Sequence, residues 1–194
     1  MFCLDIETSG LDPEKHFITC IGISSEHGIH QFSSSAKSFR EEPLVAEKRL
    51  IAEFFEWIVK KYSEPVTVLC YNGLSFDYPF IFKRAHLHSL KVPRLFATSK
   101  VIDVMVFARK LAGRLISKDE TIRKYSNIYI PRNSSGAYVA RIYFYGRVTD
   151  DEHIEMLQHN SLDVCATIRF MNALKDYPDF MEFVGESLNA THTW

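Results

Sequence analysis

A continuous apolar and β-branched run, residues 66–71 (VTVLCY), is typical of a strand that is buried on both faces of a sheet. In the segment before it, residues 44–62, apolar side chains recur at spacings of three and four, which predicts an amphipathic helix. A buried strand that follows such a helix favours a sheet covered by helices. The chain is therefore predicted to have an α/β fold.

The remaining elements follow from the same patterns. Three β-prone runs at residues 1–6, 17–23 and 29–32, the last two joined by a turn at Gly28, predict an antiparallel meander. A short strand is predicted at residues 101–103, and helices are predicted after Asp77, after Asp103, and over residues 117–125, 150–174 and 180–188. Residues 33–43 and 134–136 are predicted as loops, and residues 137–145 as helix or strand. We expect a single domain over residues 1–194, with a mixed central β-sheet flanked by helices.

Composition excludes several classes of protein. Apolar residues make up 46% and charged residues 24% of the 194 residues, which argues against fibrous and disordered chains. No run approaches the roughly 18 apolar residues of a membrane span, and the first residues do not resemble a signal peptide. The cysteines form no C-x-x-C pair, which favours free thiols and an intracellular protein, cytoplasmic or nuclear; they are Cys3, Cys20, Cys70 and Cys165.

The charges are strongly segregated along the chain. Residues 83–147 carry 14 Lys and Arg against 3 Asp and Glu, whereas the whole chain has a net charge of −1. A basic segment of this kind is a candidate surface for a polyanion, although it can equally form ion pairs with the acidic ends. The candidate phosphate contacts are Lys83, Arg84, Lys91, Arg94, Lys100, Arg109 and Lys110.

Acidic residues occur where predicted strands end and along the longest predicted helix. Asp5 and Glu7, two residues apart in a strand, project from one face, although this is also the pattern of a solvated strand end. Asp77 follows the buried strand and has the alternative role of a helix cap. His159 and Asp163 lie four residues apart and share a helix face, an arrangement also common in surface pairs.

These carboxylates together suit a site for divalent cations. Buried acids repel one another unless a cation offsets their charge, and two cations can activate a water and stabilise a leaving oxygen. His159 can accept a proton from that water because the ordinary pKa of histidine is near neutrality. His153 is an alternative base, on the far side of the helix from Asp163.

The same residues resemble the motifs of the DEDD 3′–5′ exonucleases. Residues 4–11 (LDIETSGL) are similar to the first motif and residues 72–79 (NGLSFDYP) to the second, as found in B-family polymerase proofreading domains. Residues 159–164 (HNSLDV) stand in the place of the third motif, and Ser135-Gly136 with the following aromatic run resembles free-standing members. The resemblance spans residues 2–174.

The resemblance implies a ribonuclease-H-like fold and two Mg²⁺ or Mn²⁺ ions. It implies that the ligands are Asp5, Glu7, Asp77 and Asp163, with Asp5 bridging both ions. It also implies substrate-binding roles near the terminal nucleotides for Thr8, Leu11, Asn72 and Phe76.

The third motif departs from the family pattern. One branch of the family has histidine five residues before the last aspartate, and the other has tyrosine four residues before it. Here Gln158 stands five residues before Asp163 and His159 stands four before it. We expect His159 to be the general base, because helical phase keeps it beside Asp163.

Other candidates have structural interpretations. Asp103 is a candidate helix cap or a more distant support of the site, and His86 and His88 are expected on a solvated face. The aromatic cluster is expected in the core, with base stacking beside Arg141 and Arg147 as the alternative; its members are Tyr138, Tyr143, Phe144 and Tyr145.

The sequence thus predicts a metal-dependent 3′–5′ exonuclease that acts on single-stranded or frayed DNA and releases nucleoside 5′-monophosphates. RNA as the substrate and a non-catalytic nucleic-acid-binding domain are the alternatives, and an endonuclease is a weaker one. With 194 residues the chain is expected to be free-standing or to act with a polymerase or DNA-repair partner, and no membrane association is expected.

Overall fold

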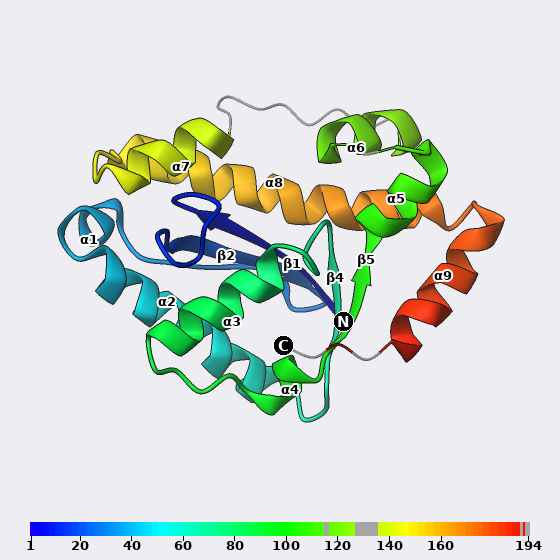
Figure 1. Cartoon of the computed structure of the whole chain (residues 1–194), viewed down its shortest axis with the longest axis horizontal. Helices are drawn as coiled ribbons and strands as arrows, with labels where there is room; N and C mark the ends of the chain where they lie inside the picture. Colours follow the sequence, from blue (N-terminus) through cyan, green and yellow to red (C-terminus); the bar gives the residue numbers. More distant parts are fainter. Residues whose placement is uncertain (115–116, 127–135, 191, 193–194) are drawn as a thin grey trace.

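The computed structural model describes residues 1–114, 117–126, 136–190 and 192, and Figure 1 shows a central sheet with helices on both sides. The strands lie in the order β3-β2-β1-β4-β5. Their bounds are β1 Phe2–Thr8, β2 Ile18–Ser25, β3 Gly28–Ser33, β4 Thr67–Cys70 and β5 Lys100–Asp103. The helices are α1 Ala36–Glu41, α2 Pro43–Lys61, α3 Asp77–Leu87, α4 Arg94–Ala97, α5 Val104–Ala112, α6 Lys118–Ser126, α7 Gly136–Phe144, α8 Asp150–Leu174 and α9 Pro178–Asn189.

The sheet is mixed, as the sequence predicts. β1, β2 and β3 pair in antiparallel order and form the predicted meander, whereas β1, β4 and β5 pair in parallel. β1 is the middle strand, and its side chains are buried on both faces. Phe2 and Leu4 pack into the larger hydrophobic cluster, and Cys3 packs into the second. Asp5 and Glu7 follow Cys3 at intervals of two residues, so they lie on the face of β1 that Cys3 occupies.

The long helix α8 crosses this sheet and packs against β1, β2 and β4 (Figure 1). A capping box fixes its start, because Thr149 Oγ1 accepts from the Glu152 amide and the Glu152 side chain accepts from the Thr149 amide. The helix covers the predicted range without change. It therefore spans the sheet at a fixed phase that carries Asn160 and Asp163 on its buried side.

Two predictions of local structure are wrong, and one short helix was not predicted. The segment predicted as a loop at residues 33–43 contains α1, which begins where the Ser35 side chain accepts from the Ser38 amide. The short helix α4 was not predicted. Asp77 is the first residue of α3 rather than its cap, and its carboxylate instead accepts from the backbone of β1.

Other predictions are confirmed or refined. Residues 137–145, left open between helix and strand, contain most of the helix α7. Ser117 caps α6 by accepting from the Glu120 amide at 3.2 Å. All four cysteines are free, and three of them are buried. Ser134 and Ser135 of the predicted loop lie outside the described residues. Within the described residues, no helix has both the length and the apolar character of a membrane span.

Candidate active site and metal centre

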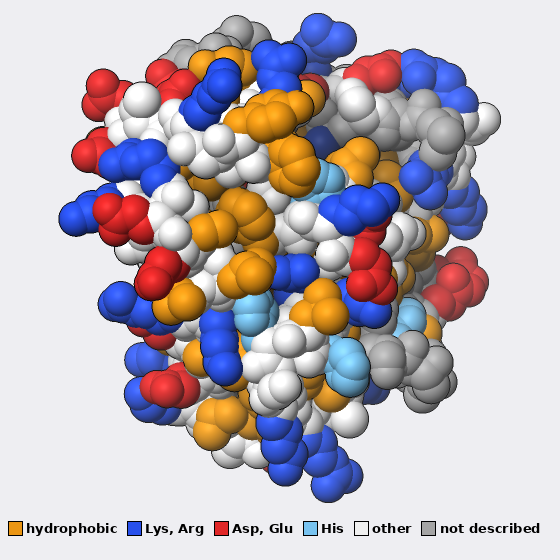
Figure 2. All heavy atoms as spheres, turned by 60° about the vertical axis from the view of Figure 1, so that its left-hand side comes forward, with side chains coloured by type: hydrophobic (Ala, Val, Ile, Leu, Met, Phe, Trp, Pro, Cys, Tyr) orange, Lys and Arg blue, Asp and Glu red, His pale blue; other side chains and the backbone are white. Residues whose placement is uncertain are grey.

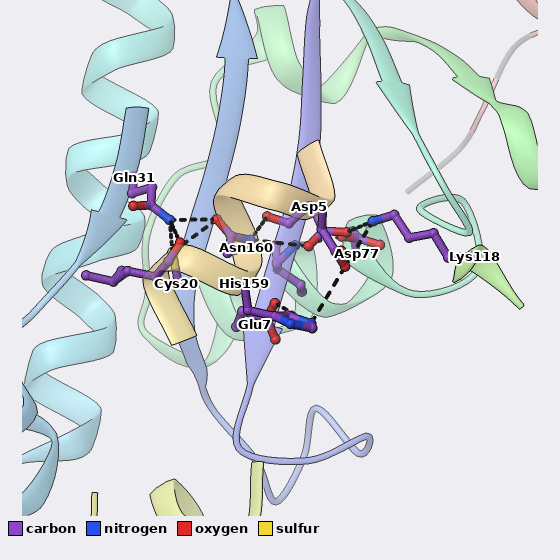
Figure 3. A network of polar contacts seen from close by, with 11 residues as sticks. Asp5, Glu7, Cys20, Gln31, Asp77, Lys118, His159 and Asn160 are labelled. Carbon is purple, nitrogen blue, oxygen red and sulfur yellow. Dashed lines mark hydrogen bonds and ion pairs between the residues drawn. The ribbon is translucent and has the colours of Figure 1, made fainter. Parts of the chain in front are cut away.

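Four carboxylates from three elements converge beside the middle strand, and Figure 3 labels Asp5, Glu7 and Asp77 among them. Asp5 and Glu7 lie on β1, and Asp163 projects from the buried side of α8. Asp77 joins them at the start of α3, where its Oδ1 accepts from the Ile6 amide at 2.9 Å. The fold therefore brings together the four acids that the sequence selected, although 158 positions separate the first from the last.

A lysine that the sequence analysis did not select lies among these acids. Lys118 Nζ is 2.8 Å from Asp5 Oδ1 and 3.2 Å from Asp163 Oδ2. The lysine begins α6, which packs against α8, and its side chain is only 13% exposed. In the sequence, Lys118 is one of 14 Lys and Arg residues in the segment 83–147, so its charge did not distinguish it. The predicted cap at Ser117 indicated only that a helix begins there.

His159 lies beside the acids, but in a position that allows two roles. Its Nε2 is 3.9 Å from Glu7 Oε1 and 3.8 Å from Asp163 Oδ2. The ligand atoms of Glu7, His159 and Asp163 all lie within 4.8 Å of one another, the spacing of groups that hold one metal ion. The predicted base is therefore also a candidate ligand. His153, the alternative, is buried against Tyr143, and the Tyr143 hydroxyl hydrogen-bonds its Nδ1.

The electrostatics of this cluster reflect burial of several like charges. Burial raises the pKa of Asp5 to about 6, although Lys118 and the amide of Asn160 act in the opposite direction. Burial, together with the nearby charge of Asp5, raises the pKa of Asp77 well above its ordinary range. The ionised acids are thus disfavoured in the metal-free protein. A divalent cation would relieve this cost, and a set of carboxylate oxygens fits Mg²⁺ or Mn²⁺.

Asn160 orients Asp5 from the helix above it. Its Nδ2 donates to the backbone oxygen and to Oδ2 of Asp5, both at 3.2 Å. Its Oδ1 accepts in turn from Gln31 Nε2 at 3.2 Å and from Cys20 Sγ at 3.4 Å (Figure 3). The sequence analysis did not select Asn160, although its place three residues before Asp163 sets it on a neighbouring part of the same helix face.

The space for Asn160 depends on Gly22, which pairs with Asp5 across β1 and β2. A Cβ at Gly22 would lie 1.8 Å from Asn160 Oδ1, so Gly22→Ala must displace that side chain. We expect about 1–3 kcal/mol of destabilisation and roughly tenfold or greater loss of whatever activity depends on Asp5. Urea unfolding with an activity assay measures both.

Gly185→Ala is the matched control for this prediction. Nothing lies within 4 Å of a Cβ at Gly185, which is inside α9, so alanine is expected to leave stability unchanged or raise it by up to about 1 kcal/mol. If Gly22→Ala were as stable as wild type, the close contact between the two elements would not exist in solution.

Asp103 supports the loop that leads to Asp77. Its two carboxylate oxygens accept from the amides of Asn72, Leu74 and Met105 at 2.8–3.1 Å. Asn72 has a φ of 68°, a left-handed conformation that asparagine tolerates better than most residues. Both interpretations of Asp103 hold, since it caps α5 and also fixes the turn before α3. Asn72 belongs to that turn, which places it close to Asp77 in the chain.

An apolar cavity of about 480 Å³ adjoins Glu7. The loop after β1 and the helix α7 form its walls; the lining residues are Ile6, Glu7, Thr8, Ser9, Gly10, Leu11, His16, Phe76, Ala137, Ala140, Arg141, Phe144 and Tyr145. Thr8, Leu11 and Phe76 are therefore gathered at one cavity. Leu11 is 83% exposed, so its side chain is available to a ligand.

The expected core position of the aromatic cluster is correct only for Tyr143, which is 1% exposed. Tyr138, Phe144 and Tyr145 are exposed, and Phe144 and Tyr145 line the cavity. The reason is that α7 presents only one side to the core, and the tight turn at Gly146 carries Tyr145 outward. Arg147 lies over the ring of Tyr145.

The described members of the basic segment differ in their surroundings. Figure 2 shows Lys and Arg side chains dispersed around one face of the molecule, with hydrophobic side chains between them. Lys83 lies on α3 and pairs with Glu14, whereas Arg109 is exposed on α5. Arg84 is buried in an ion pair with Glu47 and is not available to a substrate. The alternative, that this segment forms ion pairs with acidic parts of the chain, therefore applies to several of its members.

His86, in α3, and His88, the residue that caps the C-terminal end of α3, were both expected on a solvated face, but their exposure differs. His86 is exposed. His88 is largely buried, with a side-chain exposure of 11%, and its Nε2 lies 2.5 Å from Oε2 of the buried Glu47. It completes the cluster of Glu47 and Arg84 rather than a substrate surface.

Comparisons with known proteins support the fold. A family model described as RNase_H superfamily matches residues 2–175. The sequence matches none of the curated proteins searched. The structure is similar to that of a family B DNA polymerase from the hyperthermophilic archaeon Pyrobaculum calidifontis, with a TM-score of 0.65, 17% identity and 90% coverage of this chain. The match covers 24% of the polymerase, so the chain spans about a quarter of its length. It is also similar to NrnC of Brucella melitensis bound to pGG, with a TM-score of 0.52 and 15% identity, over 96% of this chain and 78% of NrnC.

Proposed function

Because the chain belongs to the RNase_H superfamily, we propose that it is a metal-dependent 3′–5′ exonuclease that hydrolyses terminal phosphodiesters of DNA and releases nucleoside 5′-monophosphates. One observation carries the proposal. Asp5, Glu7, Asp77 and Asp163 converge beside a cavity that has the size and apolar lining for a nucleobase. A scaffold without catalytic function would have no need to bury four acids together at a cost in stability.

The residues of the site have three roles in the proposed hydrolysis: metal binding, orientation of the ligands and proton transfer. The four carboxylates would hold two divalent cations, which when bound supply the charge that stabilises the phosphoryl group during transfer. Asn160 fixes the direction of Asp5, and the backbone of Ile6 fixes Asp77. His159 Nε2 stands between Glu7 and Asp163 and can take the proton of the attacking water.

The cavity beside Glu7 supports action at a chain end. A nucleobase can enter it only when it is unstacked from its neighbour, which favours single strands and frayed ends. Leu11 and Phe76 offer apolar contacts to such a base, and Arg141 is the cationic side chain in the wall. Nothing in this lining distinguishes a deoxyribose from a ribose, so the choice of DNA is tested directly below.

The test uses single-stranded DNA and RNA of one sequence, labelled at the 5′ end, with Mg²⁺ or Mn²⁺. We expect a ladder that shortens from the 3′ end, that EDTA abolishes, and that Asp5→Ala reduces by about 10³-fold, because the side chain at the centre of the cluster is removed. Faster digestion of DNA supports the proposed substrate, and faster digestion of RNA replaces it.

Asp179→Ala is the control for this assay. Asp179 is an exposed acid on α9 that pairs with Lys110 at 3.9 Å, so its loss is expected to leave the rate within about twofold of wild type. Internal cuts, cleavage that resists EDTA, or full activity in Asp5→Ala would each contradict the proposal.

A further inference from the structure

Lys118 occupies the space between two of the proposed metal ligands. Its ammonium is 2.8 Å from Asp5 and 3.2 Å from Asp163, and α6 holds its backbone in place. Asp163 Oδ2 also lies 3.8 Å from His159 Nε2. Two cation positions therefore share Asp163: one lies toward Glu7, whose ligand atom is within 4.8 Å of that of Asp163, and the other is filled by the ammonium of Lys118.

The interactions of Lys118 are those of a strongly held cation. Its Nζ lies within ion-pair distance of the two carboxylates of Asp5 and Asp163, and a lysine side chain is ordinarily protonated at neutral pH. The ammonium thus stays charged and offsets part of the repulsion between the acids. Within the described residues, Lys118 is the only cationic side chain that forms a salt bridge with Asp5.

We propose that Lys118 is a built-in competitor of the divalent cation, holding the position between Asp5 and Asp163 until a metal ion displaces it. The proposal rests on the proposed metal-dependent function, and it adds that loading of this position is coupled to release of Lys118. An ammonium and a divalent ion that contact the same two oxygen atoms repel each other, so the binding of one is expected to weaken the binding of the other.

Two consequences follow for the metal-free protein. Its stability without metal is expected to be raised, because one cation is supplied by its own chain. Its affinity for the metal is lowered, because each ion that enters must first break the two contacts of Lys118. The cost appears as weaker binding of the ion and not as a change in the fold.

The test is titration of the metal-free protein with Mn²⁺, followed by calorimetry and by the electron paramagnetic resonance of free Mn²⁺. Lys118→Met is expected to bind Mn²⁺ at least about tenfold more tightly than wild type, within the usual range of couplings between two ligands. Without metal, Lys118→Met is also expected to unfold at a lower temperature than wild type. Added Mn²⁺ is expected to raise its unfolding temperature by more than it raises that of wild type. Neither measurement depends on nuclease activity.

Two further variants make the result specific. Lys124→Met removes the same charge from an exposed position on the same helix, and we expect its affinity to stay within about twofold of wild type. Lys118→Arg keeps the charge and is expected to retain weak binding. Circular dichroism shows whether Lys118→Met is folded, and if it is not, tighter binding by Lys118→Gln tests the same point.

The outcomes separate the two proposals. Tighter binding by Lys118→Met, with Lys124→Met unchanged, supports the competition. Equal or weaker binding by Lys118→Met overturns it, because lysine and metal then coexist, while the proposed nuclease function stands. Absence of Mn²⁺ binding at millimolar concentration in every variant overturns both.

Discussion

Asp77→Asn is expected to lower the nuclease activity by about 10³-fold while leaving the metal-free protein as stable as wild type or more so. Asp77 Oδ1 accepts from the Ile6 amide, and an asparagine oxygen can accept the same bond. The charge that is lost is one that the fold disfavours, because burial raises the pKa of Asp77 well above its ordinary range. A carboxyl with a raised folded pKa costs stability above its unfolded pKa, so a neutral replacement removes that cost at pH 7.

The measurement pairs thermal unfolding of the metal-free protein with the nuclease assay and Mn²⁺ titration. Asp103→Asn is the informative comparison, since Asp103 is also buried but accepts from three backbone amides. Its replacement is expected to destabilise the protein, because an asparagine offers one acceptor oxygen where two are used. Retained activity in Asp77→Asn would exclude Asp77 as a ligand, and a large loss of its stability would assign it a structural role.

Arg84→Met is expected to destabilise the protein by about 3–5 kcal/mol, because it leaves the buried charge of Glu47 without its main partner. Glu47 is completely buried, and Arg84 reaches it through Nε at 2.8 Å and Nη2 at 2.6 Å. The same pair fixes the loop between β1 and β2, since Arg84 Nη1 donates to the oxygen of Pro13 and Glu47 Oε1 accepts from the Ile18 amide. The free energy of unfolding in urea measures the effect.

A matched surface pair and a double variant give the controls. Arg49→Met breaks the exposed pair with Glu53, and we expect a change within about 0.5 kcal/mol. Glu47→Leu combined with Arg84→Met removes both charges and is expected to recover much of the loss. A change below about 1 kcal/mol for Arg84→Met would mean that His88 alone satisfies Glu47.

Local patterns predicted most of the elements because they act within a few residues. The apolar spacing of α8 lies inside one segment, so the helix was predicted at its observed bounds. The short helices α1 and α4 have only six and four residues, too few for a periodic pattern to appear. The alternative of a helix cap for Asp77 was wrong, because the partner of its carboxylate, the Ile6 amide, is 71 positions away.

The acids were found because two of them share a strand face and Asp163 shares a helix face with His159, spacings that are visible in a list of residues. Lys118, Asn160 and Gly22 were missed, since each contributes through contact with a distant segment. The basic residues Lys83 and Arg84 were selected by charge alone. Charge gives no information on the partner, and both are paired with glutamates from other elements.

The sequence by itself determined the kinds of element, the mixed sheet and the choice of the four acids, because periodicity and residue type are local properties. Only the tertiary structure decided how these acids are arranged relative to one another and to the ammonium of Lys118. Strand pairing sets Gly22 opposite Asp5 and leaves room for Asn160, and the packing of α6 on α8 brings Lys118 to Asp5. Such contacts depend on how helices and strands that are distant in the sequence pack against one another. That packing is set by the burial of the apolar faces of all the elements together, which no single segment of sequence determines.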